Sequence, residues 1–389
     1  MTQTPRSPKF EIDPPTRPTA DDIQPTETPA SELPAGPPVR LGTSESATRV
    51  GRQLAEQMEE RGYHPVVIFG SSASGKSSLL TSLLAYLQVD DDAKIQIRLG
   101  EAFALDDEAY GQWAETESKG FFFRTVEEFI GGLAKASTMS PNPFFIPVVI
   151  KPHGNLPEMK FAFLESRGDW YNPQKETNEF FQRLREEISS VLVNFQKGIS
   201  FLHIAPYTQV ETWNESAQNQ QALDITMRQK ADLAIVGALN SYKAVRVVKH
   251  RDAHLFLVTK WDAYAPPGGN TGSFSAPSIE EVTGVARERY PRAYAAFLNL
   301  SLENPEKWQK QLMQYCSGVF SGRAVSRPSS ELRGQIYRYP RVLWSWLYSN
   351  ATRDEGREQS LFPQPPPRAP TLLDKFDEAV KKFMRWLDV

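Results

Sequence analysis

Runs of consecutive apolar residues alternate along the chain with stretches in which apolar residues recur at helical spacing. The runs are typical of buried strands and lie at 64–69, 144–150, 160–164, 199–205 and 254–258. Helical spacing is found at 77–87, 217–241 and 340–348. Strands that alternate with helices build parallel sheets, so this order predicts an α/β fold with a mainly parallel sheet and helices on both faces. The second and third runs are close enough to form a hairpin across His153-Gly-Asn155.

The two ends of the chain depart from this pattern. Ten of the 30 prolines lie within residues 1–40, among polar residues and hardly any apolar ones. Such a segment cannot bury enough apolar surface to offset its conformational entropy, so 1–48 is expected to be a disordered tail. A second proline-rich stretch, 356–370, predicts an extended linker. The apolar side chains of 371–389 fall on one stripe of a helix, which is expected to dock on its own body or in the groove of a protein partner.

Composition narrows the class of protein. The formal net charge is −3, which argues against a general nucleic-acid binder. The single cysteine, Cys316, rules out an intramolecular disulfide and a cysteine cluster for metal, and it favours a cytoplasmic location. No apolar run reaches the roughly 18 residues of a membrane-spanning helix, and no signal-peptide core is seen, so neither is expected.

The strongest motif is Gly70-Ser-Ser-Ala-Ser-Gly-Lys-Ser77, which matches the phosphate-binding pattern G-x-x-x-x-G-K-[ST] at every fixed position. Small residues let successive backbone N–H groups point at phosphates, and the helix that follows adds its positive end. Lys76 would place a charge on the outer phosphates, and Ser77 would place a hydroxyl on Mg²⁺. The residues expected to hold the nucleotide are Gly70, Ser71, Ser72, Ala73, Ser74, Gly75, Lys76, Ser77 and Ser78. The alternative is a small-residue turn that only caps a helix.

A second motif, Thr259-Lys-Trp-Asp262, directly follows an apolar strand. The Asp262 carboxylate can accept from both the N1–H and the exocyclic amine of guanine, a pair of donors that adenine lacks. The aliphatic stem of Lys260 can lie over the base. The alternative is a strand-ending turn with solvated charges, and the protein would then be a P-loop ATPase.

With these two motifs in this order, the chain resembles the Ras-like P-loop GTPases of the translation-factor-related class. About 180 residues separate the motifs, far more than in a minimal Ras-like domain. The resemblance therefore implies one GTPase domain over 49–355 with insertions near 90–145 and 207–250. It extends to larger bacterial members, including the double-GTPase proteins proposed to work in multi-gene defence or conflict systems. It implies a protein that binds GTP or GDP with Mg²⁺, hydrolyses GTP and acts as a nucleotide-dependent switch for protein partners.

The resemblance also implies a segment of the pattern D-x-x-G beside the metal. The best match is Glu165-Ser-Arg-Gly168, in which a glutamate replaces the aspartate. Glu165 would hold the metal through water and Gly168 would meet the γ-phosphate. Asp169 stands where many members carry the glutamine that orients the attacking water, and Arg167 would offset charge in the transition state. If this segment is only a charged surface turn, the protein is a GTP-binding scaffold with little or no turnover.

Two more positions implied by the resemblance have several candidates. Thr116, Thr125 and Thr138 are candidates for the metal-binding switch threonine, and we favour Thr125. For the small-residue loop that faces guanine O6 we favour Ser317 over the loop 320–322.

Other polar residues carry no motif. The basic cluster in 243–251 predicts a solvated face. The five histidines show no ligand spacing and are expected to be structural.

Overall fold

The computed structural model describes only part of the chain. The described residues are 44–71, 74–89, 95–130, 142–166, 185–207, 217–261, 279–300, 309–314, 319–320, 323–324, 330–354 and 361–362. All of them belong to one compact unit, Val39–Val389. Helix α1 begins at Ser44, inside the stretch expected to be a tail up to residue 48. The expected helix at 371–389 and most of the expected linker lie outside the described residues.

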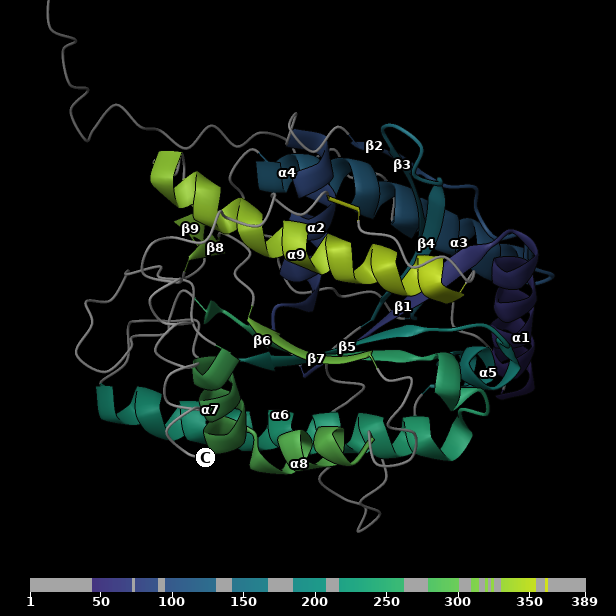
Figure 1. Cartoon of the computed structure of the whole chain (residues 1–389). Helices are drawn as coiled ribbons and strands as arrows, with labels where there is room; N and C mark the ends of the chain where they lie inside the picture. The colour runs from purple at the N-terminus through teal and green to yellow at the C-terminus, as the bar shows by residue number, and fades with distance from the viewer. Residues whose placement is uncertain are drawn as a thin grey trace, which may run out of the picture. The chain divides into compact units, whose positions relative to one another are not determined.

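A seven-stranded sheet forms the centre of the unit, in the order β2-β3-β4-β1-β5-β6-β7 (Figure 1). Its strands are β1 Tyr63–Phe69, β2 Ile95–Leu99, β3 Phe144–Pro152, β4 Met159–Glu165, β5 Ser200–Pro206, β6 Ala253–Thr259 and β7 Gln309–Gln314. Strands β4, β1, β5, β6 and β7 run parallel, whereas β3 is antiparallel to both β2 and β4. The predicted hairpin is therefore confirmed. The parallel central strands are buried on both faces, which is why they appear in the sequence as unbroken apolar runs.

Helices cover both faces of the sheet (Figure 1). One face carries α2 Lys76–Val89, α4 Val126–Ile130 and α9 Ser330–Asp354. The other carries α1 Ser44–Glu60, α5 Glu186–Asn194, α6 Ala217–Val245, α7 Ile279–Arg289 and α8 Pro291–Asn299. With a phosphate-loop motif between β1 and α2 and one antiparallel strand beside β4, this is the Ras-like α/β P-loop fold that the sequence predicts.

The segment between α2 and β3 adds structure at one edge of the sheet. It contains β2, α3 Glu108–Lys119, the π-helix η2 Gly120–Thr125 and α4, of which α4 packs on α2. The described part of the chain also includes the 3-10 helix η4 Lys249–Arg251 and a small hairpin of β8 Val319–Phe320 and β9 Arg323–Ala324. None of the helices within the described ranges is both long and apolar enough to cross a membrane.

Helix α9 packs on α2, the helix that follows the phosphate loop. Trp344 is completely buried, its ring packs edge-on against Phe161 and Phe163, and its indole N–H donates to Leu83 O over 2.8 Å. The predicted Trp-rich helix near 340–348 is confirmed, but it begins ten residues earlier, at Ser330, and runs through Pro340. A proline tolerated within a helix loses one backbone hydrogen bond, and here the apolar face around Trp344 holds the helix in place.

The expectation of a solvated basic face at 243–251 is wrong for Arg246. Its side chain is fully buried and forms a two-pronged ion pair with Asp252, with both N–O distances at 2.9 Å. The same guanidinium donates to the carbonyl of Leu192 in the last turn of α5 and to the carbonyls of Phe195 and Lys197, which follow the helix. Arg246 thus acts as a donor for carbonyls that lack a partner within α5, and it connects the end of α5 to the end of α6.

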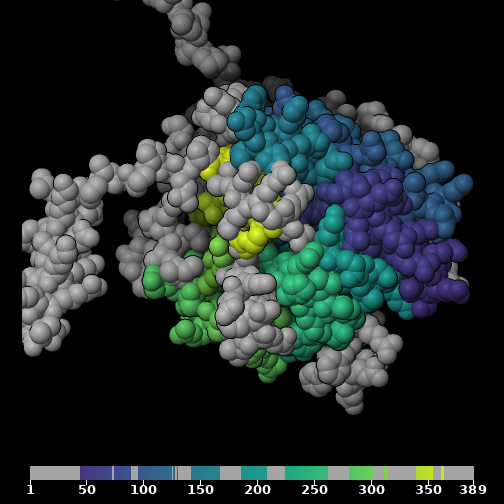
Figure 2. Space-filling model, turned by 45° about the vertical axis from the view of Figure 1, so that its right-hand side comes forward, coloured from purple at the N-terminus to yellow at the C-terminus, as the bar shows by residue number. Residues whose placement is uncertain are grey.

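Helix α5 also packs along α1, which lies on the molecular surface in Figure 2 (purple).

Candidate nucleotide-binding site

The phosphate-loop motif lies where β1 ends and α2 begins. A Cβ added to Gly70 would lie 2.6 Å from Ser74 Oγ and 3.0 Å from Ile204 Cβ, so a larger residue there would force these neighbours to shift. Gly75 has φ +90°, a left-handed conformation that favours glycine. Gly70 is therefore favoured by close packing against Ser74 and Ile204, and Gly75 by its backbone conformation. Ser72 and Ala73 lie outside the described residues.

Lys76 is the first residue of α2 and reaches back over the loop. Its ammonium group is buried and donates to Gly70 O and Ser71 O, each over 2.9 Å. Ser77 and Ser78 follow in the first turn of α2, where backbone N–H groups point out of the end of the helix. A cation and the N–H groups of a first helical turn at one point suit an anion such as phosphate.

Glu165 ends β4, the parallel neighbour of β1, and its side chain is buried. Ser77 Oγ donates to Glu165 Oε1 over 2.6 Å, so two of the three residues predicted for the metal site are in direct contact. Mg²⁺ is coordinated by oxygen atoms, so the hydroxyl of Ser77 and the carboxylate of Glu165 are suitable ligands for this ion. Within the described ranges no group of three His, Cys, Asp or Glu side chains gathers around a common point.

The second motif is joined to the phosphate loop by a hydrogen bond. Thr259, the last residue of β6, donates from Oγ1 to Ser74 O over 2.8 Å. Lys260 has φ +54° and is, among the described residues, the one non-glycine in the left-handed region. Trp261 is buried and directly precedes Asp262, which lies outside the described residues.

The remaining predicted site residues are not brought into contact by the described structure. Arg167, Gly168, Asp169 and Ser317 lie outside the described residues. Strand β7 ends at Gln314, three residues before Ser317, and its carboxyl end lies at the same edge of the sheet as Thr259. Thr125 is the last residue of the π-helix between α3 and α4, and its side chain is not described.

Behind Thr259 lies a polar contact that the sequence did not predict. Tyr207, which follows β5, donates its backbone N–H to Thr259 O over 2.8 Å. Arg289, at the end of α7, donates to Tyr207 O over 2.7 Å and to the Tyr207 hydroxyl over 3.0 Å. The two residues are 82 positions apart and belong to no local motif, so no sequence signal pointed to them.

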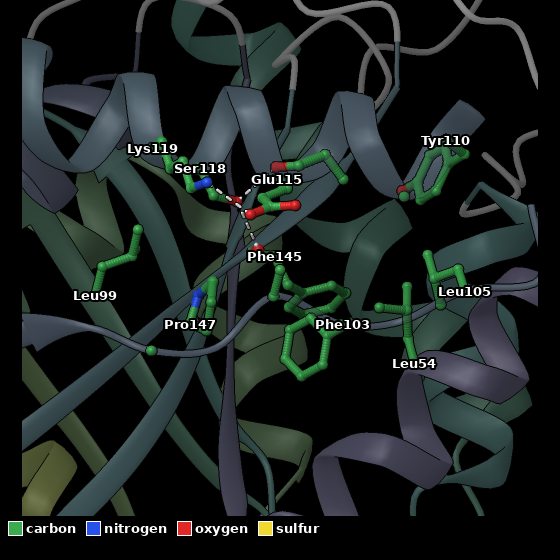
Figure 3. A pocket seen from close by; sticks show the side chains of 14 residues that line it. Leu54, Leu99, Phe103, Leu105, Tyr110, Glu115, Ser118, Lys119, Phe145 and Pro147 are labelled. Atoms are coloured by element: carbon green, nitrogen blue, oxygen red, sulfur yellow. Dashed lines mark hydrogen bonds and ion pairs between the residues drawn. The ribbon is translucent and has the colours of Figure 1, made fainter. Parts of the chain in front are cut away.

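A separate pocket opens at the β2–β3 edge of the sheet, and Figure 3 shows the side chains that line it. Its walls come from α1, α3, β3 and the segment after β2, and none of its lining residues belongs to the phosphate loop. Apolar side chains such as Leu54, Phe103 and Phe145 line it, and Lys119 and Glu115 form an ion pair of 2.7 Å on its α3 side.

Comparisons with known proteins do not add to this description of the site. No protein-family profile and no curated protein sequence matches the chain. The chain is similar over 71% of its length to 97% of a chain in the signal recognition particle receptor SRb-GTP/SRX complex from Chaetomium thermophilum, with 11% identity and a TM-score of 0.32. It is similar over 80% of its length to 93% of Toc33 from Arabidopsis thaliana, solved in complex with GDP and Mg²⁺, with 10% identity and a TM-score of 0.35. Likeness at this level says nothing about individual residues or activity.

Proposed function

We propose that this protein binds a guanine nucleotide with Mg²⁺ at the carboxyl edge of its parallel strands and hydrolyses GTP. The observation that carries the proposal is the hydrogen bond from Thr259 Oγ1 to Ser74 O. It joins the segment with base-recognition chemistry to the phosphate loop across 185 positions of sequence.

The phosphates would lie against the loop 70–75 and the first turn of α2, with Lys76 turning from its carbonyl partners to the outer phosphates. Ser77 and Glu165 would hold Mg²⁺, which neutralises phosphate charge when bound. The Asp262 carboxylate would accept from the guanine base, Lys260 would cover it and Ser317 would face its O6.

Hydrolysis would depend on the segment that follows Glu165. Gly168 would meet the γ-phosphate, Asp169 would orient water, Arg167 would offset charge, and Thr125 would complete the metal site. Binding and release of this segment would give protein partners two states to distinguish. The segment 371–389, which the sequence predicts to be a helix, is the proposed partner element. By the resemblance to larger bacterial members, the switch would serve a cytoplasmic multi-gene defence or conflict system.

Competition binding tests the base assignment. Unlabelled GTP, XTP and ATP compete against a fluorescent guanine nucleotide on the full chain and on the Asp262→Asn variant. The wild type should prefer GTP, and the variant should gain affinity for XTP, because an amide can donate to the carbonyl that xanthine carries in place of the amine. Preference for ATP in the wild type, or an unchanged order in the variant, would contradict guanine binding and favour the P-loop ATPase.

Single-turnover hydrolysis separates the enzyme from the GTP-binding scaffold. Asp169→Asn should lower the rate at least about tenfold with little change in GTP affinity, since positioning roles contribute about 10²–10⁴ in rate. No measurable hydrolysis by the wild type, with GTP still bound, would identify the scaffold. A wild-type rate in the variant would remove Asp169 from the catalytic residues.

A further inference from the structure

The ends of β5 and β6 are held together by hydrogen bonds that begin at Arg289. Arg289 donates to the backbone carbonyl of Tyr207, Tyr207 donates its own N–H to the carbonyl of Thr259, and Thr259 donates to Ser74 O. Each of these bonds is between 2.7 and 2.8 Å long. A continuous series of hydrogen bonds therefore runs from the end of α7 to the phosphate loop.

The Arg289 guanidinium is fixed from several sides. It lies 3.8 Å from the centre of the Tyr207 ring, a cation–π contact, and it also donates to the Tyr207 hydroxyl. Asp224 of α6 lies 3.9 Å from it and is itself paired with Arg228 at 2.8 Å. The side chain of Arg289 is only 20% exposed, so little solvent screens these contacts. The planar guanidinium of Arg289 is bound along its edge by hydrogen bonds and on its face by the Tyr207 ring, so its orientation is fixed. The same contacts fix the orientation of Tyr207.

The segment that Tyr207 supports is unusual in its backbone. Lys260 adopts φ +54°, which side chains other than glycine rarely take and which persists only where the surroundings impose it. Trp261, the next residue, is buried, and its ring meets the Tyr207 ring edge-on at 6.2 Å. Tyr207 therefore holds this turn by a backbone bond on one side and by ring packing on the other. Asp262 is the next residue in the sequence.

We propose that Arg289 is a positioning residue for base recognition: through Tyr207 it sets the turn 259–261 and with it the placement of the Asp262 carboxylate. This inference rests on the proposed function, because it requires Asp262 to bind the base. Arg289 acts through Tyr207 and is not proposed to contact the nucleotide, so it is not a catalytic residue. Its loss should weaken the recognition of the guanine amine more than the binding of phosphates.

The test compares GTP with ITP, whose base lacks the exocyclic amine that Asp262 would bind. Arg289→Gln should lower the ratio of GTP to ITP affinity about tenfold, a change typical of coupling between contacting residues. Arg289→Lys, which keeps the charge but loses the planar fork, should lower the ratio in the same direction. Tyr207→Phe keeps the ring and both backbone bonds and should stay near the wild-type ratio. Arg287→Gln, an exposed arginine on the same helix, is the matched control and should not change the ratio.

The same measurement in the Asp262→Asn background decides how Arg289 acts. If Arg289 works through Asp262, adding Arg289→Gln to that variant should not lower the ratio further. If both Arg289 variants lose affinity for GTP and for ITP by the same factor, the inference is overturned, because a purely structural role would affect the binding of both nucleotides alike. If Asp262→Asn itself leaves the ratio unchanged, the base assignment fails and the inference fails with it. If Asp262→Asn changes the ratio and neither Arg289 variant does, only the inference fails.

Discussion

Ser77 Oγ donates to Glu165 Oε1 over 2.6 Å, which joins the first turn of α2 to the end of β4. The glutamate stands where the Ras-like pattern has an aspartate, and its longer side chain reaches the serine directly. Because Glu165 is buried, its charge is poorly screened by water and acts strongly on anything bound beside it. This contact leads to the first prediction.

Glu165→Gln should raise the Mg²⁺ concentration needed for GTP binding about 10- to 100-fold, the range for losing a residue that supports a metal site. The amide keeps the size of the side chain and an acceptor for Ser77 but removes the charge that Mg²⁺ would meet. The measurement is a Mg²⁺ titration with a fluorescent GTP analogue. Glu158→Gln, an acid beside Arg98 on the surface, is the control and should leave the requirement unchanged. An unchanged requirement in Glu165→Gln would show that Glu165 does not support the metal.

Thr259→Val should destabilise the fold by about 1 kcal/mol, because it removes the hydrogen bond to Ser74 O without changing the size of the side chain. It should also weaken GTP binding, since the phosphate loop loses its tie to β6. Thr259→Ser keeps the hydroxyl and is the control. Urea denaturation and nucleotide titration on the same samples check both expectations. Wild-type values for Thr259→Val in both measurements would show that the bond has no consequence.

Arg246→Met should cost about 3–5 kcal/mol of stability, since it leaves the carboxylate of Asp252 buried without its cation. Burial raises the pKa of Asp252, and the bonds from Arg246 counteract that rise. Without Arg246 the carboxyl group should therefore take up a proton at a higher pH. Replacing both residues, Arg246→Met with Asp252→Leu, should cost less than Arg246→Met alone because no buried charge is left unpaired.

Urea denaturation of the three proteins checks this expectation. Arg251→Met, at an exposed position next to Asp252, serves as the control and should stay near the wild type. A double variant less stable than Arg246→Met would mean that lost packing and the hydrogen bonds that Asp252 accepts from Tyr242 and Ile199 outweigh the unpaired charge.

His203 should make the protein less stable in mild acid. It is completely buried, its Nε2 lies 3.1 Å from Nδ1 of His254, and desolvation lowers its pKa from 6.5 to about 3. Between these values the unfolded chain binds a proton that the folded chain excludes, so stability is full above pH 6.5 and falls as the pH drops toward 3. The loss from this group is about 1.4 kcal/mol per pH unit.

Chemical denaturation at pH 7 and pH 5 measures that slope. In His203→Phe the loss of stability between pH 7 and pH 5 should be smaller than in the wild type by about 2 kcal/mol, whatever the absolute stability of the variant. His153→Phe changes an exposed histidine in the β3–β4 turn and should leave the slope as in the wild type. An equal slope in wild type and His203→Phe would contradict the exclusion of the proton from the folded state.

The sequence predicted the elements that depend on local pattern. Central parallel strands must be apolar on both faces, so β1, β5 and β6 appear as continuous runs wherever they lie in the fold. The phosphate loop was also predictable, because its residues are consecutive in the sequence and Gly75 is favoured by the left-handed conformation of the loop itself. The α/β fold followed from the order of these elements.

Contacts between distant segments were decided by the tertiary structure. The sequence supplied Ser77, Glu165 and Thr259 as separate candidates, but only the parallel pairing of β1 with its neighbours brings them to one edge of the sheet. Charged residues show the limit most clearly. A local pattern predicts a solvated arginine, and it cannot reveal that Arg246 meets the open carbonyls of α5, or that Arg289 meets Tyr207. The reason is physical: a charge is buried only where partners from elsewhere in the chain replace its water, and those partners are adjacent only after folding.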